Sequence, residues 1–174
     1  MDHPRLPRSG ALALAVASVC ALLAAPALTS ANTSHAGWPH IDGKLVMDKG
    51  PAGESHVLQG DPNRHNELLG GYGNDTIIGG SAGDVIWSDY HPSGQPAHQE
   101  AIIHAGNGPN FIYSNDTVNQ VWTGDNPKTI VHAHFGSGTI YCGSPKIIVY
   151  LSHKSRPHYR LSGCRRLSYH TIGY

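Results

Sequence analysis

Aliphatic residues recur through the middle of the chain at intervals of nine or ten positions, with one interruption. In such a pattern, strand alternation turns one side chain inward and both of its neighbours outward. Regular repetition of one short strand and one turn predicts a solenoid of stacked coils. Sandwich strands spaced by about eight to twelve residues overlap this interval, so the spacing alone leaves that fold open. The expected inward positions are Leu68, Ile77, Ile86, Ile102, Ile112, Val121, Ile130, Ile140 and Val149.

A motif rich in glycine and aspartate marks the start of this pattern. Two consecutive units read Gly70-Gly71-Tyr72-Gly73-Asn74-Asp75-Thr76-Ile77-Ile78 and Gly79-Gly80-Ser81-Ala82-Gly83-Asp84-Val85-Ile86-Trp87. The first unit fits the calcium-binding repeat G-G-x-G-x-D-x-U-x, where U is a large aliphatic residue. The chain therefore resembles the RTX, or haemolysin-type, repeat family, and it is similar to small secreted actinobacterial proteins with one short β-roll. The resemblance implies an all-β, right-handed parallel β-roll or β-helix of nonapeptide repeats.

The same resemblance implies calcium as the cofactor. Calcium takes about six to eight oxygen ligands, so two stacked turns must contribute carbonyls and carboxylates to one ion. Only Asp75 and Asp84 keep a carboxylate at the sixth position of a unit, so we expect one or two weak sites with dissociation constants of about 0.1–1 mM. The alternative is a decayed roll that kept its glycines for turn geometry. The implied ligand turns contain Gly71, Gly73, Asp75, Gly80, Ala82 and Asp84, with Asn66, Asn110 and Asp89 on neighbouring turns.

The N-terminal segment has the features of a secretory signal peptide. Arg5 and Arg8 precede an apolar stretch of about fifteen residues, which is shorter than a membrane span. We expect cleavage between residues 27 and 36, and a secreted, extracellular product without a membrane span. The chain then divides into a signal peptide at 1–36, an N-terminal cap at 37–60, β-roll repeats at 61–151 with an inserted loop at 88–100, and a C-terminal cap at 152–174.

The cysteines predict one covalent cross-link. Cys142 and Cys164 remain after cleavage, because Cys20 lies inside the apolar stretch. An even pair in an exported chain indicates a disulfide. The repeat places both cysteines in turns on the same side of neighbouring coils, about 4.8 Å apart, near the separation that a disulfide accepts. Histidine is abundant, yet no cysteine or carboxylate completes a zinc site at a recognisable spacing.

One sheet is expected to present an apolar outer face. Such a face is a platform for a glycan, a peptide or a second copy of the chain. The alternative is that its side chains form a cross-strand ladder that stabilises the sheet. The expected outward residues on this face are Trp87, Phe111, Tyr113, Val131 and Tyr150.

Charge is divided along the chain, although the whole sequence is formally neutral. No acidic residue follows Asp125, whereas seven Lys and Arg residues do, among them Arg165 and Arg166. This basic end should attract an anionic cell-surface polymer or glycan. No basic helix or aromatic RNA-binding motif accompanies it, so nucleic acid is not an expected partner.

No nucleophile elbow, zinc-protease motif or phosphate-binding loop occurs in the sequence, so we expect a protein that is not an enzyme. The favoured function is a calcium-binding β-roll module, binding or structural, at or outside the cell surface. One alternative is a carbohydrate-active β-helix enzyme, whose carboxylates would have to come from the loop between Asp89 and Glu100. The other is a self-assembling or adhesive solenoid without a functional calcium site.

Overall fold

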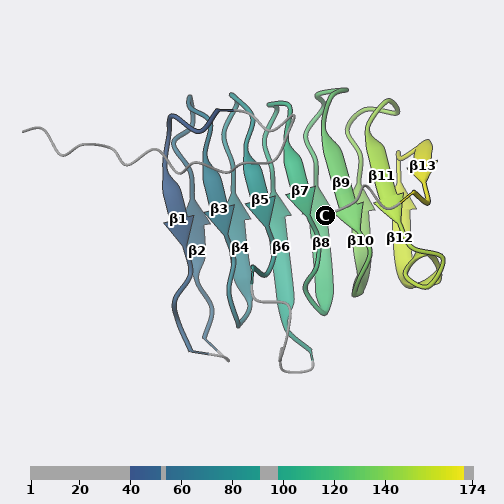
Figure 1. Cartoon of the computed structure of the whole chain (residues 1–174), viewed down its shortest axis with the longest axis horizontal. Helices are drawn as coiled ribbons and strands as arrows, with labels where there is room; N and C mark the ends of the chain where they lie inside the picture. The colour runs from purple at the N-terminus through teal and green to yellow at the C-terminus, as the bar shows by residue number, and fades with distance from the viewer. Residues whose placement is uncertain (1–39, 52–53, 91–97, 171–174) are drawn as a thin grey trace, which may run out of the picture.

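The computed structural model describes residues 40–51, 54–90 and 98–170, and these form two parallel sheets that face each other (Figure 1). Successive strands alternate between the sheets, so two strands and two turns make one coil. About six coils stack along the long axis of the molecule. Every strand pairing is parallel. The predicted all-β parallel solenoid is therefore confirmed.

The strands divide by number into an odd sheet and an even sheet. The odd sheet contains, in spatial order, β1 (Leu45–Met47), β3 (Glu67–Leu69), β5 (Val85–Trp87), β7 (Phe111–Tyr113), β9 (Ile130–Ala133), β11 (Ile148–Leu151) and β13 (Arg166–Ser168). The even sheet contains β2 (Val57–Gln59), β4 (Asp75–Ile78), β6 (Glu100–His104), β8 (Val118–Trp122), β10 (Ser137–Tyr141) and β12 (Tyr159–Ser162). A three-residue 3-10 helix, η1 (Arg156–His158), precedes β12.

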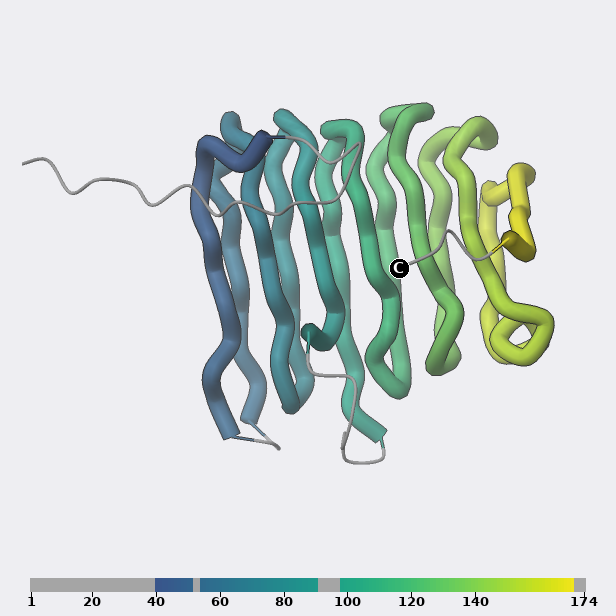
Figure 2. The backbone as a smooth tube through the Cα atoms, viewed as in Figure 1, coloured from purple at the N-terminus to yellow at the C-terminus, as the bar shows by residue number. Residues whose placement is uncertain are grey.

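The turns stack along two edges of the flattened coil (Figure 2). Turns at the lower edge of Figure 1 lead from the odd sheet to the even sheet, and turns at the upper edge lead back. Because paired strands lie about 4.8 Å apart, side chains at matching positions of neighbouring turns come into contact. The inserted loop between β5 and β6 lies at the lower edge, and its residues 91–97 fall outside the described part.

The core is a ladder of aliphatic side chains between the two sheets. Seven of the nine expected inward residues are fully buried there, but the predictions for Ile102 and Ile130 are wrong by one position. Ile103 and Val131 point inward with no exposed surface, whereas Ile102 and Ile130 are half-buried. Each position is one of two adjacent aliphatic residues, and only the pairing register, Ile77 with Ile103 and Ile112 with Val131, selects the inward one.

Both predicted caps contribute strands to the solenoid. β1 and β2 fall within 37–60 and pair with β3 and β4, while β12 and β13 fall within 152–174 and pair with β10 and β11. The predicted disulfide joins Cys142 to Cys164, with the two Cα atoms 5.0 Å apart. The predicted signal peptide lies outside the described residues. Within those that are described, no helix has the length and apolar character needed to cross a membrane.

The corrected register predicts unequal effects of two neighbouring truncations. Ile103→Ala should lower the free energy of unfolding by about 2–5 kcal/mol, because it removes a fully buried side chain and leaves a cavity. Ile102→Ala, its matched control on the outer face, should cost less than about half as much. Urea denaturation of both variants measures the difference. A larger loss for Ile102→Ala would show that β6 is paired one residue out of register.

Candidate functional site

Four aspartates lie along the lower edge, one on each of four neighbouring coils. Asp48 follows β1, Asp75 begins β4, Asp89 lies just after β5, and Asp116 lies just before β8. Asp89 has no exposed surface, Asp75 and Asp116 have 1% each, and the Asp48 side chain has 5%. Buried carboxylates are costly unless they are hydrogen-bonded, paired or bound to a cation. The lower edge therefore concentrates buried negative charge.

Three of these carboxylates, Asp48, Asp75 and Asp116, keep one buried oxygen without a hydrogen-bond partner in the described part of the chain. Asp75 accepts a 3.0 Å hydrogen bond from the Gly71 amide on Oδ2, and Asp116 accepts a 2.7 Å bond from the Thr117 amide on Oδ1. The other oxygen of each, Oδ1 of Asp75 and Oδ2 of Asp116, is buried and has no hydrogen-bond partner in the described part of the chain. Such oxygens are suited to an incoming cation.

The pKa values reflect the same concentration of charge. Burial, with smaller contributions from the negative charges of Asp89 and Asp75, raises the pKa of Asp116 to about 7, although the Thr117 amide opposes the rise. Burial also raises the pKa of Asp75, the amide of Gly71 opposes this, and the charge of Asp48 adds to it. Like charges on stacked coils thus disfavour one another's ionised form.

One histidine joins the acids of the first two coils. His56 lies just before β2, and its Nδ1 is 3.2 Å from Asp48 Oδ1 and 3.8 Å from Asp75 Oδ1. On the other side of the ring, Nε2 is 3.3 Å from Glu54 Oε2. Sequence reasoning missed Asp48 and His56 as site residues. Their proximity to Asp75 follows only once 45–47 and 57–59 are assigned as strands of the first coil.

The upper edge uses its polar side chains differently. Asp84 Oδ1 accepts two 2.7 Å bonds, from the amide and the side-chain Nδ2 of Asn66, and Oδ2 accepts a 2.6 Å bond from the Gly80 amide. The Asp84 amide donates in turn to Asn110 Oδ1 at 2.8 Å, and the Asn110 amide donates to Thr129 Oγ1 at 3.1 Å. Both oxygens of Asp84 are therefore occupied by N–H donors, which gives this carboxylate a structural role in the turn.

The predicted calcium turns thus separate into two groups. Gly71, Gly73 and Asp75 lie at the lower edge, while Gly80, Ala82, Asp84, Asn66 and Asn110 lie at the upper edge. Gly73 is essential to the lower turn, because its φ is 129° and an added Cβ would lie 2.1 Å from the Glu54 carbonyl oxygen. Asp89 lies at the lower edge near Asp116, as the charge effect on Asp116 indicates. Glu100, at the end of the inserted loop, accepts a hydrogen bond from the Gln120 side chain.

The outer face of the odd sheet carries a ladder of stacked rings. Trp87 stacks on Tyr113, Tyr113 on His132, and His132 on Tyr150, with ring centroids 4.1, 4.7 and 5.0 Å apart and planes within 13° of parallel. The prediction that Val131 lies on this outer face is wrong, because Val131 points inward and is fully buried. Its neighbour His132 lies in the ladder instead. Because each ring covers the face of its neighbour, the arrangement favours ladder stabilisation over a platform for a sugar ring.

Much of this odd-sheet face is buried in the folded chain. Leu69 and Tyr113 are each 7% exposed, and Phe111 is half-buried. The even sheet has a shorter and more exposed ladder, in which Trp122 stacks between His104 and Tyr141. The face predicted to take a partner is therefore less accessible than the other one.

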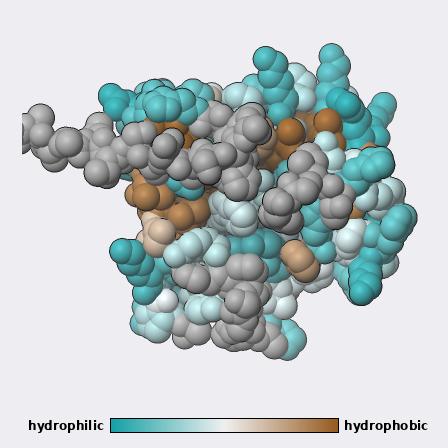
Figure 3. Space-filling model, viewed as in Figure 1, coloured by the Kyte–Doolittle hydropathy of each residue, from teal (hydrophilic) through white to brown (hydrophobic). Residues whose placement is uncertain are grey.

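The C-terminal coils form the predicted basic end, and Figure 3 shows hydrophilic side chains gathered there, around β11 and β13. Arg165 and Arg166 are exposed, as are four others of the seven cations after Asp125. Arg156 is half-buried and donates to the Tyr159 carbonyl at 3.3 Å.

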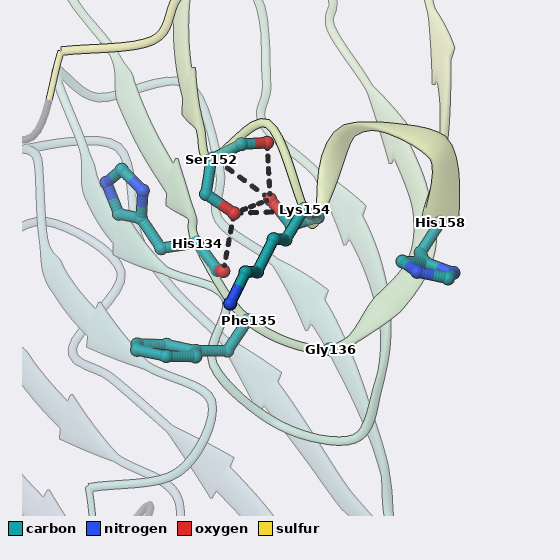
Figure 4. Close-up of a pocket in the computed structure, with 7 residues that line it drawn as sticks. His134, Phe135, Gly136, Ser152, Lys154 and His158 are labelled. Atoms are coloured by element: carbon teal, nitrogen blue, oxygen red, sulfur yellow. Dashed lines mark hydrogen bonds between the residues drawn. The ribbon is translucent and has the colours of Figure 1, made fainter.

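A pocket opens at the lower edge of this end, between the turn after β9 and the turn that leads into η1 (Figure 4). Lys154 extends toward Phe135, and His158 lines the pocket from η1. The Ser155 hydroxyl donates to the Ala133 carbonyl at 2.7 Å, and the Ser152 hydroxyl donates to the His134 carbonyl at 3.2 Å. These hydroxyls stabilise the turn, so neither is poised as a nucleophile.

No family model, curated protein or solved structure matches this chain.

The buried imidazole of the odd-sheet ladder predicts a pH effect on stability. Burial, with a smaller contribution from His134, lowers the pKa of His132 from its ordinary 6.5 to about 4. Between these values the unfolded chain binds a proton that the folded chain does not, so His132 makes stability fall as pH falls from about 6.5 to about 4. His132→Phe keeps an aromatic ring in the ladder and should flatten this dependence.

Thermal unfolding between pH 4 and pH 7 measures the effect. The matched control is His153→Phe, since His153 is exposed and also stacks on a ring, that of Tyr169. The slope of melting temperature against pH should be shallower in His132→Phe and unchanged in His153→Phe. Equal slopes in His132→Phe and the unmodified chain would mean that His132 binds its proton equally well in the folded and unfolded states.

Proposed function

We propose that this chain is an exported, calcium-binding β-solenoid that acts as a binding or structural module at or outside the cell surface. The observation that carries the proposal is the row of buried carboxylates at the lower edge. The half-satisfied oxygens of Asp75 and Asp116 lie on either side of the coil that bears Asp89. Calcium prefers oxygen ligands and would neutralise charge that the turn amides leave uncompensated. The resemblance of residues 70–78 to a calcium-binding repeat supports the same ion.

The proposed calcium region differs from the one that the motif implies. Asp75 and Asp89 remain in it, and Asp116 takes the place of Asp84, whose oxygens are occupied by the amides of Gly80 and Asn66. Three carboxylates alone offer too few oxygen ligands for calcium. Carbonyl oxygens of the lower-edge turns would complete the coordination. Weak binding of an ion abundant outside cells would stabilise the solenoid after export by mass action.

Calcium should therefore raise the melting temperature of the secreted chain. At about ten to a hundred times the dissociation constant, the gain is about 1–3 kcal/mol, or several degrees for a chain of this size. Asp116→Asn should remove most of that gain. In a chelator the same variant should be at least as stable as the unmodified chain, because it removes a buried charge that Asp89 and Asp75 oppose.

The matched control is Asp125→Asn, which removes one exposed negative charge from the upper edge. It should keep the full calcium-dependent shift in melting temperature. If Asp116→Asn and Asp125→Asn respond equally to calcium, the lower-edge site is wrong.

A second candidate function is adhesion to an anionic cell-surface polymer, and the exposure of six cations at the basic end favours it. The proposed calcium ligands Asp75, Asp89 and Asp116 and the exposed arginines Arg165 and Arg166 lie on different coils, so calcium binding and adhesion are compatible in one molecule.

Retention on an anionic matrix tests the adhesive function. Reversal of Arg165 and Arg166 to Glu should abolish retention at low salt, since both side chains are exposed. Retention of the unmodified chain should itself weaken with salt, because exposed charges are screened over about 8 Å at physiological ionic strength. The control replaces Lys44 and Lys49 with Glu, which makes the same charge change at the opposite end of the solenoid. Equal losses in the two variants would make retention an effect of net charge alone.

A further inference from the structure

We propose that Asp48, His56 and Asp75 form a site for a transition-metal ion, with zinc as the best fit, that fastens the first coil of the solenoid to the second. This site shares Asp75 with the proposed calcium region, but it rests on a different observation: an imidazole nitrogen facing two buried carboxylates. One ligand atom from each residue can be chosen so that all three lie within 4.8 Å of one another.

The three ligand atoms are close to the geometry that zinc requires. His56 Nδ1 lies 3.2 Å from Asp48 Oδ1 and 3.8 Å from Asp75 Oδ1. Zinc bonds to nitrogen and oxygen of about 2.0–2.2 Å in a tetrahedron place neighbouring ligand atoms about 3.3–3.5 Å apart. The two distances from His56 Nδ1 bracket this value, and the three ligand atoms lie within 4.8 Å of one another.

Unsatisfied atoms converge on the same point. Asp48 Oδ2, His56 Nδ1 and Asp75 Oδ1 are all buried, and none has a hydrogen-bond partner of good geometry in the described part of the chain. The Asp75 side chain is fully buried and that of Asp48 is 5% exposed. A single proton on His56 cannot neutralise both carboxylates, whereas a dication can. The ligand is therefore expected to be a cation.

The surrounding groups orient these ligands as they do in metal sites. His56 Nε2 faces Glu54 Oε2 at 3.3 Å, which leaves Nδ1 as the ligand atom. A metal-binding histidine commonly donates its other ring N–H to a carboxylate in this way. The Gly50 amide donates to Asp48 Oδ1 at 2.9 Å, and the Gly71 amide donates to Asp75 Oδ2 at 3.0 Å. A turn amide therefore orients each carboxylate.

Two glycines keep the space around the site. A Cβ at Gly71 would lie 2.7 Å from Asp48 Oδ2, and a Cβ at Gly50 would lie 2.2 Å from the His56 ring. Neither glycine has a positive φ, so close approach to the site residues explains the glycine at each position.

The ligand set separates this ion from calcium. Imidazole nitrogen suits zinc, copper, iron and nickel, whereas calcium takes oxygen ligands. One histidine and two carboxylates supply three protein ligands, which leaves one tetrahedral position for solvent. Zinc accepts this mixture of nitrogen and oxygen donors without a preferred geometry of its own, so it is the best fit.

The position in the fold suggests what the metal does. Asp48 and His56 belong to the turn between β1 and β2, the first coil, and Asp75 begins β4 in the second coil. A terminal coil has a neighbour on one side only, so it is the coil most prone to open. Zinc would fasten the N-terminal end, as the disulfide between Cys142 and Cys164 fastens the C-terminal end.

Zinc titration by calorimetry, after removal of metals with a chelator, tests the site. The unmodified chain should bind one equivalent, His56→Ala should lose at least about tenfold in affinity, and the control His158→Ala should keep full binding, since His158 is exposed and far from the first coil. His56→Ala should still be stabilised by calcium, which separates failure of this proposal from failure of the calcium region. Equal zinc binding by His56→Ala and His158→Ala, or none by the unmodified chain, would overturn it.

Hydrogen exchange of the unmodified chain provides a test that needs no variant. Zinc should slow amide exchange in β1 and β2 more than in β10 and β12, because the ion joins the first two coils only. Uniform protection along the solenoid, or none, would overturn the proposed role in fastening the first coil.

Discussion

Parallel, in-register stacking of short strands is the constraint on which this structure depends. Each coil repeats the backbone of the one before it at a distance of about 4.8 Å, so residues at matching positions touch. Inside, this gives an unbroken aliphatic ladder that includes Ile77, Ile103 and Val121. Outside, it gives stacked rings, from Trp87 to Tyr150 on one face. Residues of one kind at matching positions of successive coils therefore form a continuous row.

The two edges differ in how the stacked polar side chains satisfy one another's hydrogen bonds. At the upper edge, Asn66, Asp84 and Asn110 alternate amide and carboxylate, so each accepts hydrogen bonds from neighbouring coils and the row is self-sufficient. At the lower edge, carboxylates lie on four successive coils, and Asp48, Asp75 and Asp116 each keep one buried oxygen without a hydrogen-bond partner in the described part of the chain. Stacking is thus stabilising where donors and acceptors alternate, and we propose that a cation stabilises the row where they do not.

Much of the fold was predictable because the nonapeptide period and the glycine turns are local features of the sequence. Two choices of inward residue were wrong, Ile102 and Ile130, because adjacent aliphatic residues satisfy the same pattern and only pairing distinguishes them. The candidate site was less predictable. Asp84 fits the calcium motif, yet its hydrogen bonds give it a structural role. His56 carries no motif, since its partners lie eight residues before it and nineteen after it, in two different coils.

We propose that stacked carboxylates at the lower edge bind cations, whereas the carboxylate of Asp84 at the upper edge does not. Anomalous diffraction from a crystal of the secreted chain grown with zinc and calcium tests it most directly, because it locates each ion. Zinc should lie among Asp48, His56 and Asp75, calcium should lie near Asp116, and Asp84 should bind no ion. An ion bound by Asp84, or a lower edge whose carboxylates contact only protein and water, would contradict it.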